Sequence, residues 1–366
     1  MRRSLLSVCG LVAFAGVVVH DRALAQDTIN VGVMMPKSGP NADSVRRYVI
    51  APVEWAAKLA NDKGGVLGKQ IRVIEEDGRT PEMAVAALRK LIDVDKIAAD
   101  ISTYTYLVLP QLPVAEESKI VLVGPATSHP DFTKNPWAVR IALTGPPQAQ
   151  RTAQLVHSVG DKTAVYFSEN NEAGQSMQKA FTAELSKLGG EVLATDTYKI
   201  EASDVRGELV KFKSYNPDAF YFMGTTGRPN ALILQQMAEV GFHPKHIFST
   251  YLMEDAEVQR LDPKLTEGVI WVGLDIDPEF SKAFTAALGY PPDTMAGMSF
   301  GAMQLLIDGL ARAGTASDPV KLRDTIDNYG AFKTPVGTFT FAGSGDSSVA
   351  MAVKTMKAGK IVPYKP

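Results

Sequence analysis

The sequence predicts an α/β fold in which parallel β-sheets are covered by helices. Short apolar segments alternate with amphipathic helical patterns along the chain, an order typical of strand–helix repeat units. Several apolar segments are dense in Val, Ile and aromatic residues, as expected for strands buried on both faces. The predicted strands are residues 29–35, 71–74, 120–123, 139–143, 164–167, 219–223 and 269–272, and clear helices are predicted at residues 175–188 and 229–241.

Residues 59–93 form the clearest of these units. A helix ends at Gly64 and Gly65, because glycine adopts the positive φ that helix ends commonly need. A short strand follows, and a second helix begins after Thr80, which supplies an N-cap, with Pro81 in its first turn. The buried stripe of this second helix is predicted to comprise Met83, Ala84, Ala87, Leu88, Leu91 and Ile92.

The N-terminus predicts a cleaved secretory signal peptide at residues 1–25. Two arginines follow Met1, an apolar run occupies residues 5–19, and Ala23-Leu24-Ala25 supplies a small-x-small cleavage site. The apolar run is shorter than the ~20 residues of a membrane span, so no membrane insertion is expected after cleavage. The alternative is an uncleaved anchor. We therefore expect a soluble, exported protein.

Composition narrows the function further. Cys9 is the single cysteine and lies within the predicted signal, so a mature chain would have no disulfide, no thiol catalysis and no cysteine metal site. The formal net charge is −2 over 366 residues, without a basic block or stripe. Because nucleic-acid binding requires clustered positive charge, we expect no nucleic-acid partner.

Three motifs that superficially suggest catalysis have plainer interpretations. Ser299 lies in a G-x-S-x-G pattern, but its apolar neighbours are at helical spacing and no strand precedes it, which predicts a helix. Residues 64–69 lack the glycine spacing of a phosphate loop, and a strand follows them where a helix is required. His243 and His246 are predicted to lie in a surface loop without a nearby carboxylate. The sequence therefore predicts no enzyme, cofactor or metal.

Several segments resemble, in the correct order, a single family. The pattern N-x-x-G-G-V-L-G begins at Asn61, and P-V-A-E-E at residues 113–117 leads to the turn at 124–128. A Ser-Gly-Pro turn before residues 41–42, the segment 334–339 and the segment 357–360 complete the series. Together they resemble the periplasmic solute-binding proteins of the branched-chain amino acid type (leucine/isoleucine/valine-binding-like), which deliver ligands to ABC transporters.

The resemblance implies a two-lobed periplasmic-binding-protein fold of type I. Each lobe is then a parallel sheet flanked by helices, and three crossing strands form a hinge near residues 143–147, 271–275 and 332–337. It also implies a periplasmic location, a small carboxylate ligand in the cleft and an inner-membrane ABC permease as partner. A ligand-sensing receptor component that is not coupled to transport is the alternative. The implied division is residues 27–143 plus 274–333 for lobe 1 and residues 145–272 plus 334–366 for lobe 2.

Candidate ligand residues in lobe 1 lie where predicted strands end, since ligands of such folds bind beyond the carboxyl ends of parallel strands. Residues 124–128 resemble the family's carboxylate-holding segment, which implies a backbone role for Ala126 and a hydroxyl role for Thr127; an ordinary capped turn is the alternative. Residues 102–106 replace the family's Gly-Pro-x-Ser-Ser loop. Tyr104 and Thr105 would offer a ring and a hydroxyl there, unless this segment is a half-exposed strand.

The lobe 2 candidates depart further from the family. Glu172 lies in the loop after a predicted strand, and the next position holds Ala173 where a tyrosine is common. Thr225 replaces a frequent aromatic residue, and Tyr251 stands where the family has an acidic residue for an α-ammonium group. We therefore expect a carboxylate ligand, either an amino acid or, preferably, an aromatic or other non-standard carboxylic acid.

Overall fold

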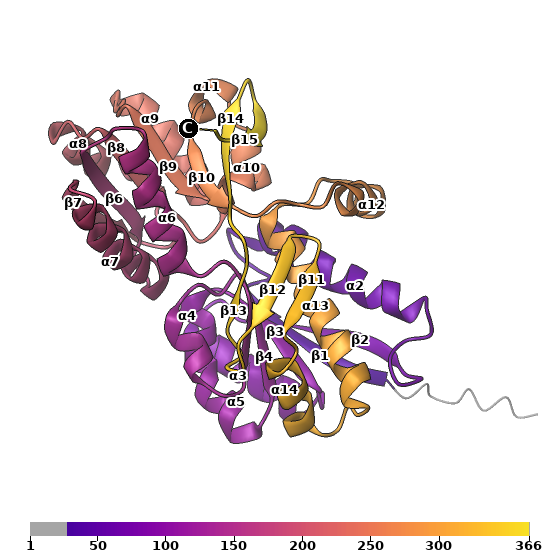
Figure 1. Ribbon diagram of the computed structural model, residues 1–366. Helices are drawn as coiled ribbons and strands as arrows, with labels where there is room; N and C mark the ends of the chain where they lie inside the picture. The colour runs from indigo at the N-terminus through magenta and orange to yellow at the C-terminus, as the bar shows by residue number, and fades with distance from the viewer. Residues whose placement is uncertain (1–27, 366) are drawn as a thin grey trace, which may run out of the picture.

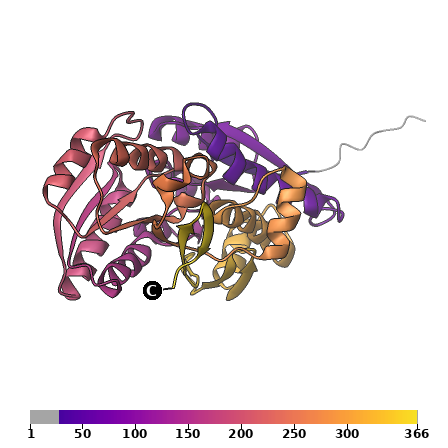
Figure 2. The ribbon, with the colours of Figure 1, turned by 90° about the horizontal axis from the view of Figure 1, so that it is seen from above.

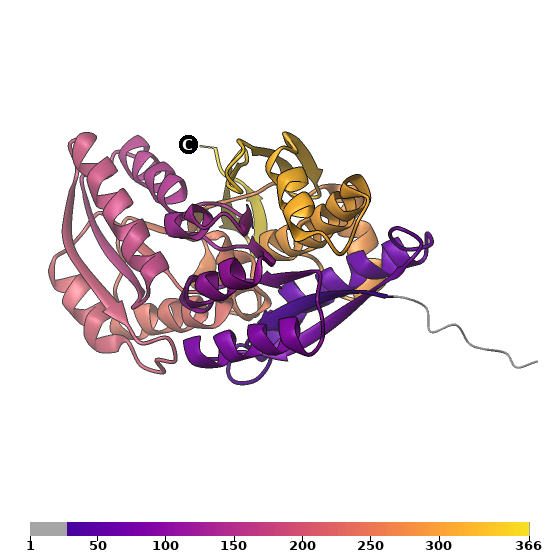
Figure 3. The same ribbon diagram turned by 90° about the horizontal axis from the view of Figure 1, so that it is seen from below.

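The computed structural model describes residues 28–365. Two lobes lie side by side and are joined by three chain segments (Figures 1 and 2). The view from below shows the helices of each lobe gathered around its sheet (Figure 3). The signal peptide predicted at residues 1–25 lies outside the described residues.

Lobe 1 is built on a five-stranded parallel sheet. Its strands are β1 (Thr28–Met35), β2 (Gln70–Asp77), β3 (Ala99–Ser102), β4 (Val121–Pro125) and β5 (Ala138–Ile141). Their spatial order is β2-β1-β3-β4-β5. Four of them were predicted, whereas β3 was not, because it is short and contains Asp100. That carboxyl is fully buried and accepts a hydrogen bond from Ser102 Oγ at 2.5 Å.

Helix α3 (Pro81–Asp93) begins as predicted, since Thr80 Oγ1 accepts a hydrogen bond from Met83 N at 3.3 Å. The predicted stripe is wrong at Met83, whose side chain is 42% exposed because it lies in the first turn at the solvent edge of the helix. Ile92 is half-buried. The buried members of the stripe are Ala84, Ala87, Leu88 and Leu91.

Three helices from late in the chain return to lobe 1. Trp55 packs against Phe280, Phe284 and Phe300, with ring centroids 5.0–5.8 Å apart, and so ties two of these late helices to an early one. The helices of the lobe, besides α3, are α1 (Ala42–Val45), α2 (Ala51–Asn61), α4 (Thr105–Val108), α5 (Leu112–Ser118), α12 (Pro278–Leu288), α13 (Thr294–Ala313) and α14 (Pro319–Asp327), with the shorter turns η1 (Arg46–Ile50), η2 (Leu109–Gln111) and η3 (Pro130–Lys134).

Lobe 2 is built on a seven-stranded mixed sheet. Its strands are β6 (Thr163–Glu169), β7 (Glu191–Tyr198), β8 (Ala219–Met223), β9 (His246–Thr250), β10 (Ile270–Gly273), β14 (Ala352–Lys357) and β15 (Lys360–Pro363). The order is β15-β14-β10-β9-β8-β6-β7, with β14 and β15 antiparallel. The surface-loop interpretation of His246 is wrong: it opens β9, and its Nδ1 lies 2.8 Å from Asp161 Oδ2.

Two helices of lobe 2 test the predicted boundaries. Helix α7 (Glu172–Lys187) starts three residues earlier than predicted, because Asn171 caps it by accepting a hydrogen bond from Gly174 N at 2.9 Å. Helix α9 (Gly227–Val240) ends at Gly241, which has a φ of 64°. The remaining helices of the lobe are α6 (Gly145–Ser158), α8 (Arg206–Ser214), α10 (Ala256–Gln259) and α11 (Pro263–Thr266), with the turn η4 (Tyr251–Glu254).

A small antiparallel sheet changes the predicted division between lobes. Strands β11 (Ala331–Thr334), β12 (Gly337–Phe341) and β13 (Ser347–Ser348) form it. Val336 packs against Gly297 of α13, where a Cβ on the glycine would lie 2.1 Å from Val336 Cγ1. Residues 334–348 therefore pack on lobe 1, although they were predicted to join lobe 2. The third connection runs from β13 to β14 at residues 349–351, later than the predicted 332–337 (Figure 1).

Candidate ligand-binding site

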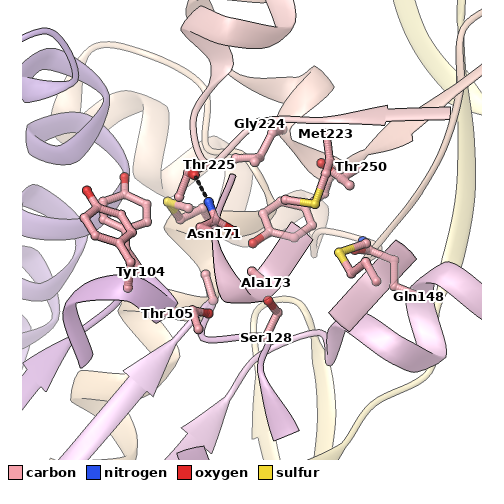
Figure 4. Close-up of a pocket in the computed structure, with 16 residues that line it drawn as sticks. Tyr104, Thr105, Ser128, Gln148, Asn171, Ala173, Met223, Gly224, Thr225 and Thr250 are labelled. Atoms are coloured by element: carbon pink, nitrogen blue, oxygen red, sulfur yellow. Dashed lines mark hydrogen bonds between the residues drawn. The ribbon is translucent and has the colours of Figure 1, made fainter. Parts of the chain in front are cut away.

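A cavity lies between the lobes, at the carboxyl ends of their parallel strands (Figure 4). The cavity is lined from both lobes, so one ligand can contact both of them. Its lining residues are Tyr104, Thr105, Tyr106, Ala126, Ser128, Gln148, Asn171, Ala173, Met177, Met223, Gly224, Thr225, Thr250, Tyr251, Leu252 and Met295.

This cavity is named the inner cavity. Its lobe 1 side is made by two loops with unusual backbone geometry. Tyr104 has a φ of 67° and Ala126 a φ of 60°, values that L-residues other than Asn and Asp rarely adopt. Each follows a parallel strand, β3 or β4, and turns the chain sharply at the cavity wall. Strained residues of this kind concentrate at ligand clamps and active sites.

The wall combines aromatic rings with flexible apolar side chains. The rings of Tyr104 and Tyr106 stack with centroids 6.3 Å apart and an interplanar angle of 15°. Three methionines, Met177, Met223 and Met295, complete the apolar surface. Methionine sulfur and tyrosine faces both pack well against aromatic rings. The cavity is therefore suited to a flat, apolar ligand body.

Charge is the most informative property of the inner cavity. Of the residues that the structure describes, no Asp, Glu, Lys, Arg or His lines it. The first turns of helices α6, α7 and α13 reach it through Gln148, Ala173 and Met295. The N-termini of α6 and α7 carry a partial positive charge that favours an anion, whereas that of α13 is already capped by Glu254 and Asp293, which accept hydrogen bonds from Thr294 N and Ala296 N. The cavity thus offers a favourable field for a carboxylate and no side-chain counter-charge for an ammonium group.

Two hydroxyl groups at the cavity are buried without a partner. Tyr104 Oη and Thr250 Oγ1 have no hydrogen-bond partner among residues 28–365. Burial raises the pKa of Tyr104 well above its usual range, and also that of Tyr251, so both phenols stay protonated as donors. Because a buried donor without an acceptor is costly, these hydroxyls point to a ligand that accepts hydrogen bonds.

Asn171 connects the cavity to a buried acid in lobe 2. Its Nδ2 donates to Glu169 Oε2 at 3.2 Å and to Thr225 Oγ1 at 3.3 Å (Figure 4 shows the second bond). Glu169 is 1% exposed, and burial raises its pKa to about 8. At pH 7 its carboxyl is therefore largely neutral and does not repel an anion held in the cavity.

The acidic residues one turn beyond Tyr251, Glu254 and Asp255, form hydrogen bonds and an ion pair outside the inner cavity. Glu254 pairs with Lys354 Nζ at 2.9 Å and accepts hydrogen bonds from Trp271 Nε1 and Thr294 N. Asp255 accepts a hydrogen bond from Ser44 Oγ at 2.8 Å, across the cleft. Neither carboxylate lines the inner cavity.

The lobes contact one another around the cavity. Besides the Ser44–Asp255 bond, Thr226 Oγ1 donates to Asn41 Oδ1 at 3.1 Å, and Ala256 N donates to Tyr48 Oη at 3.1 Å. These contacts hold the two lobes together over the ligand cavity.

Five of the seven predicted ligand residues line the inner cavity. Thr127 does not: its side chain is fully buried, and Ala126 and Ser128 face the cavity on either side of it. Glu172 lines instead an outer cavity, which shares Tyr106 and Asn171 with the inner one. The predicted residues that line the inner cavity are Tyr104, Thr105, Ala126, Thr225 and Tyr251.

Several residues that line the cavity are not among the predicted ligand residues. Asn171 could have been found, since an Asn directly before an amphipathic helix is a typical N-cap. Gln148 lies in the first turn of α6, and its Nε2 donates to Val272 O at 3.0 Å. The three methionines have no local signal, because methionine at helical spacing is usually core.

Other chemistries find no support in the part of the chain that the structure describes. Ser299 lies inside α13, fully buried, as the helical interpretation predicted. No cluster of three or more potential metal ligands occurs among residues 28–365. Within the same residues, no helix combines the length and apolarity that crossing a membrane requires.

Comparisons with known proteins agree with this architecture. The family model described as periplasmic binding protein matches residues 28–360. Leu/Ile/Val-binding protein homolog 2 of Brucella abortus is 24% identical over 364 residues, which cover 96% of this chain and 95% of that protein.

Solved structures confirm the predicted type I two-lobed fold. Leucine-binding protein LivK of Thermotoga maritima has a TM-score of 0.84 at 23% identity, covering 92% of this chain and 98% of that one. A solute-binding protein of an ABC transporter from R. palustris, in complex with benzoate, has a TM-score of 0.83 at 21% identity, covering 92% and 95%. The chain belongs to the periplasmic binding protein family.

Proposed function

We propose that this protein is the periplasmic solute-binding component of an ABC importer and binds a small carboxylate that lacks an α-ammonium group. An aromatic or hydroxylated carboxylic acid is the preferred class. The observation that carries the proposal is the inner cavity, which no charged side chain of the described residues lines and which helix N-termini and protonated hydroxyls border. Thr105, Ala126, Thr225 and Tyr251 are its proposed ligand contacts, together with Tyr104.

An aliphatic amino acid would fit this cavity poorly. Its ammonium group would lose water without meeting a carboxylate, because Glu254 and Asp255 do not line the cavity and Glu169 is largely neutral. An unpaired buried charge costs several kcal/mol. Since relatives of this fold include both a leucine-binding protein and a benzoate complex, the fold itself permits either ligand class.

The proposed mechanism is a population shift between open and closed lobes. A ligand that contacts Tyr104 in lobe 1 and Asn171 in lobe 2 stabilises the closed arrangement in which Ser44 meets Asp255. The closed form would then dock on an inner-membrane permease. No group on the protein changes covalently during this cycle.

A thermal-shift screen tests the proposal. The protein from residue 26 onward, freed of bound ligand by unfolding and refolding, is mixed with aliphatic amino acids, amides, dicarboxylates and aromatic carboxylic acids. A ligand at 100 times its dissociation constant adds about 2.7 kcal/mol of stability and raises the melting temperature. Stabilisation by aromatic or other non-amino acids is expected. Stabilisation by Leu, Ile or Val alone would overturn the ligand class while leaving the carrier role intact.

A further inference from the structure

Arg140 is a fully buried cation behind the loop that forms one wall of the inner cavity. Its side chain is 0% exposed and lies on β5. The guanidinium donates to Thr127 O at 3.1 Å and to His129 O at 3.0 Å. The same loop presents Ala126 and Ser128 to the cavity. Arg140 thus fixes the backbone of a ligand-facing loop without facing the cavity itself.

The other side of Arg140 contacts a segment about 200 residues later in the chain. Its Nε lies 3.0 Å from Asp346 Oδ1 in an ion pair, and its backbone N donates to Gly345 O at 2.8 Å. Ser347 Oγ donates to Arg140 O at 2.6 Å. A Cβ on Gly345 would lie 2.2 Å from Ala138 O, so this segment sits directly against β5.

This late segment leads straight into the third connection between the lobes. Strand β13 begins at Ser347, and residues 349–351 then cross to β14 in lobe 2 (Figure 1). One buried guanidinium therefore contacts both the ligand-facing loop and the start of a hinge segment. The guanidinium is planar and rigid, donates to two carbonyls of the loop and forms an ion pair with Asp346, so a shift of the late segment changes the position of the group that holds the loop.

We propose that Arg140 is a positioning residue that couples the loop at residues 126–129 to the third interlobe connection through Asp346. The coupling rests on the proposed function in one respect, namely that this loop contacts the ligand. It predicts that a change at Asp346, outside the cavity, alters ligand binding. Removing Arg140 itself risks unfolding, because the loop carbonyls would lose their buried donors. The milder variants Asp346→Asn and Ser347→Ala are therefore the primary test.

Hydrogen exchange of the ligand-free protein provides the first readout. Asp346→Asn should raise amide exchange at residues 126–129 about threefold or more while leaving β8 at the wild-type rate. A merely structural role would raise exchange in both places. Asp324→Asn is the matched control, because Asp324 pairs with Arg323 at 2.6 Å in the same lobe and does not touch the loop. The control should change neither region.

Binding provides the second readout, with benzoate and leucine as probes. Whichever probe stabilises the wild type should bind Asp346→Asn about threefold to tenfold more weakly, and Asp324→Asn with wild-type affinity. Wild-type loop exchange together with wild-type affinity in both Asp346→Asn and Ser347→Ala would overturn the coupling. If leucine alone binds the wild type, the proposed ligand class fails, and the exchange data still decide whether Arg140 couples loop to hinge.

Discussion

Asn171→Asp adds one negative charge to the inner cavity with almost no change in shape. The Asn171 side chain caps α7 through its oxygen, and aspartate is an equally good cap, so the helix should be retained. The new carboxylate would lie beside Glu169, whose pKa burial already raises to about 8. Because two adjacent carboxyls disfavour double ionisation, Glu169 should stay neutral, and the variant differs from the wild type by one added charge.

The expected loss of affinity follows from Coulomb repulsion between this charge and the ligand carboxylate. At roughly 6 Å and an effective dielectric constant of about 20, two unit charges repel by about 3 kcal/mol. Because each 1.4 kcal/mol corresponds to about tenfold in the dissociation constant, benzoate should bind the variant about a hundredfold more weakly. An amino acid would respond in the opposite way, since the new carboxylate supplies the partner that its ammonium group lacks in the wild type.

Isothermal titration calorimetry at pH 7 with benzoate and leucine measures both responses. Asn170→Asp is the matched control. It adds the same charge one residue away, at an exposed position where solvent screens the charge. The control should change either affinity by less than about threefold. Two results would refute the claim that the cavity favours an anion and lacks a partner for an ammonium group. One is unchanged benzoate affinity in Asn171→Asp. The other is leucine that binds the wild type but no longer binds Asn171→Asp.

Three further predictions concern buried groups near the cleft and in α13. Burial raises the pKa of Glu169 from 4.5 to about 8, so the folded state must bury a charge as the pH rises. Between about pH 5 and pH 8 the wild type should therefore lose on the order of 4 kcal/mol of unfolding free energy relative to Glu169→Gln. An unfolding free energy in urea that changes equally in both proteins over this range would contradict the prediction. Ser44→Ala removes the bond to Asp255 and should weaken ligand binding about fivefold, whereas the exposed Ser214→Ala should not, as titration would show. Ser299→Ala removes a buried hydroxyl without a described partner, so unfolding stability should stay level or rise by about 1 kcal/mol, and lost ligand binding would refute the helical-core interpretation.

Most of the fold could be predicted because its strands and caps have local signals. Strand β8 and the cap at Thr80 appear where the residue pattern places them. Strand β9 was not predicted. It begins with the polar residue His246, whose partner Asp161 is distant in sequence and so gives no local signal. The position of residues 334–348 also escaped, because a short hairpin does not reveal which lobe covers its apolar face.

The candidate site could be predicted only in part, for a related reason. Strand ends identify which loops border the cleft, and Tyr104 and Ala126 lie in such loops. Backbone direction then decides which side chain faces the cavity: the positive φ of Ala126 turns the loop so that Thr127 points into the protein. Residue types alone do not determine such a turn, because Ala rarely adopts a positive φ.

The central claim is that the cavity holds a carboxylate and rejects an α-ammonium group. Titration calorimetry with two matched pairs tests it most directly: leucine against 4-methylpentanoate, and phenylalanine against 3-phenylpropanoate, which differ only in that group. The deaminated acid of at least one pair should bind at least about tenfold more tightly than its amino acid, since no carboxylate among residues 28–365 lines the cavity. Tighter binding of the amino acids in both pairs would contradict the claim.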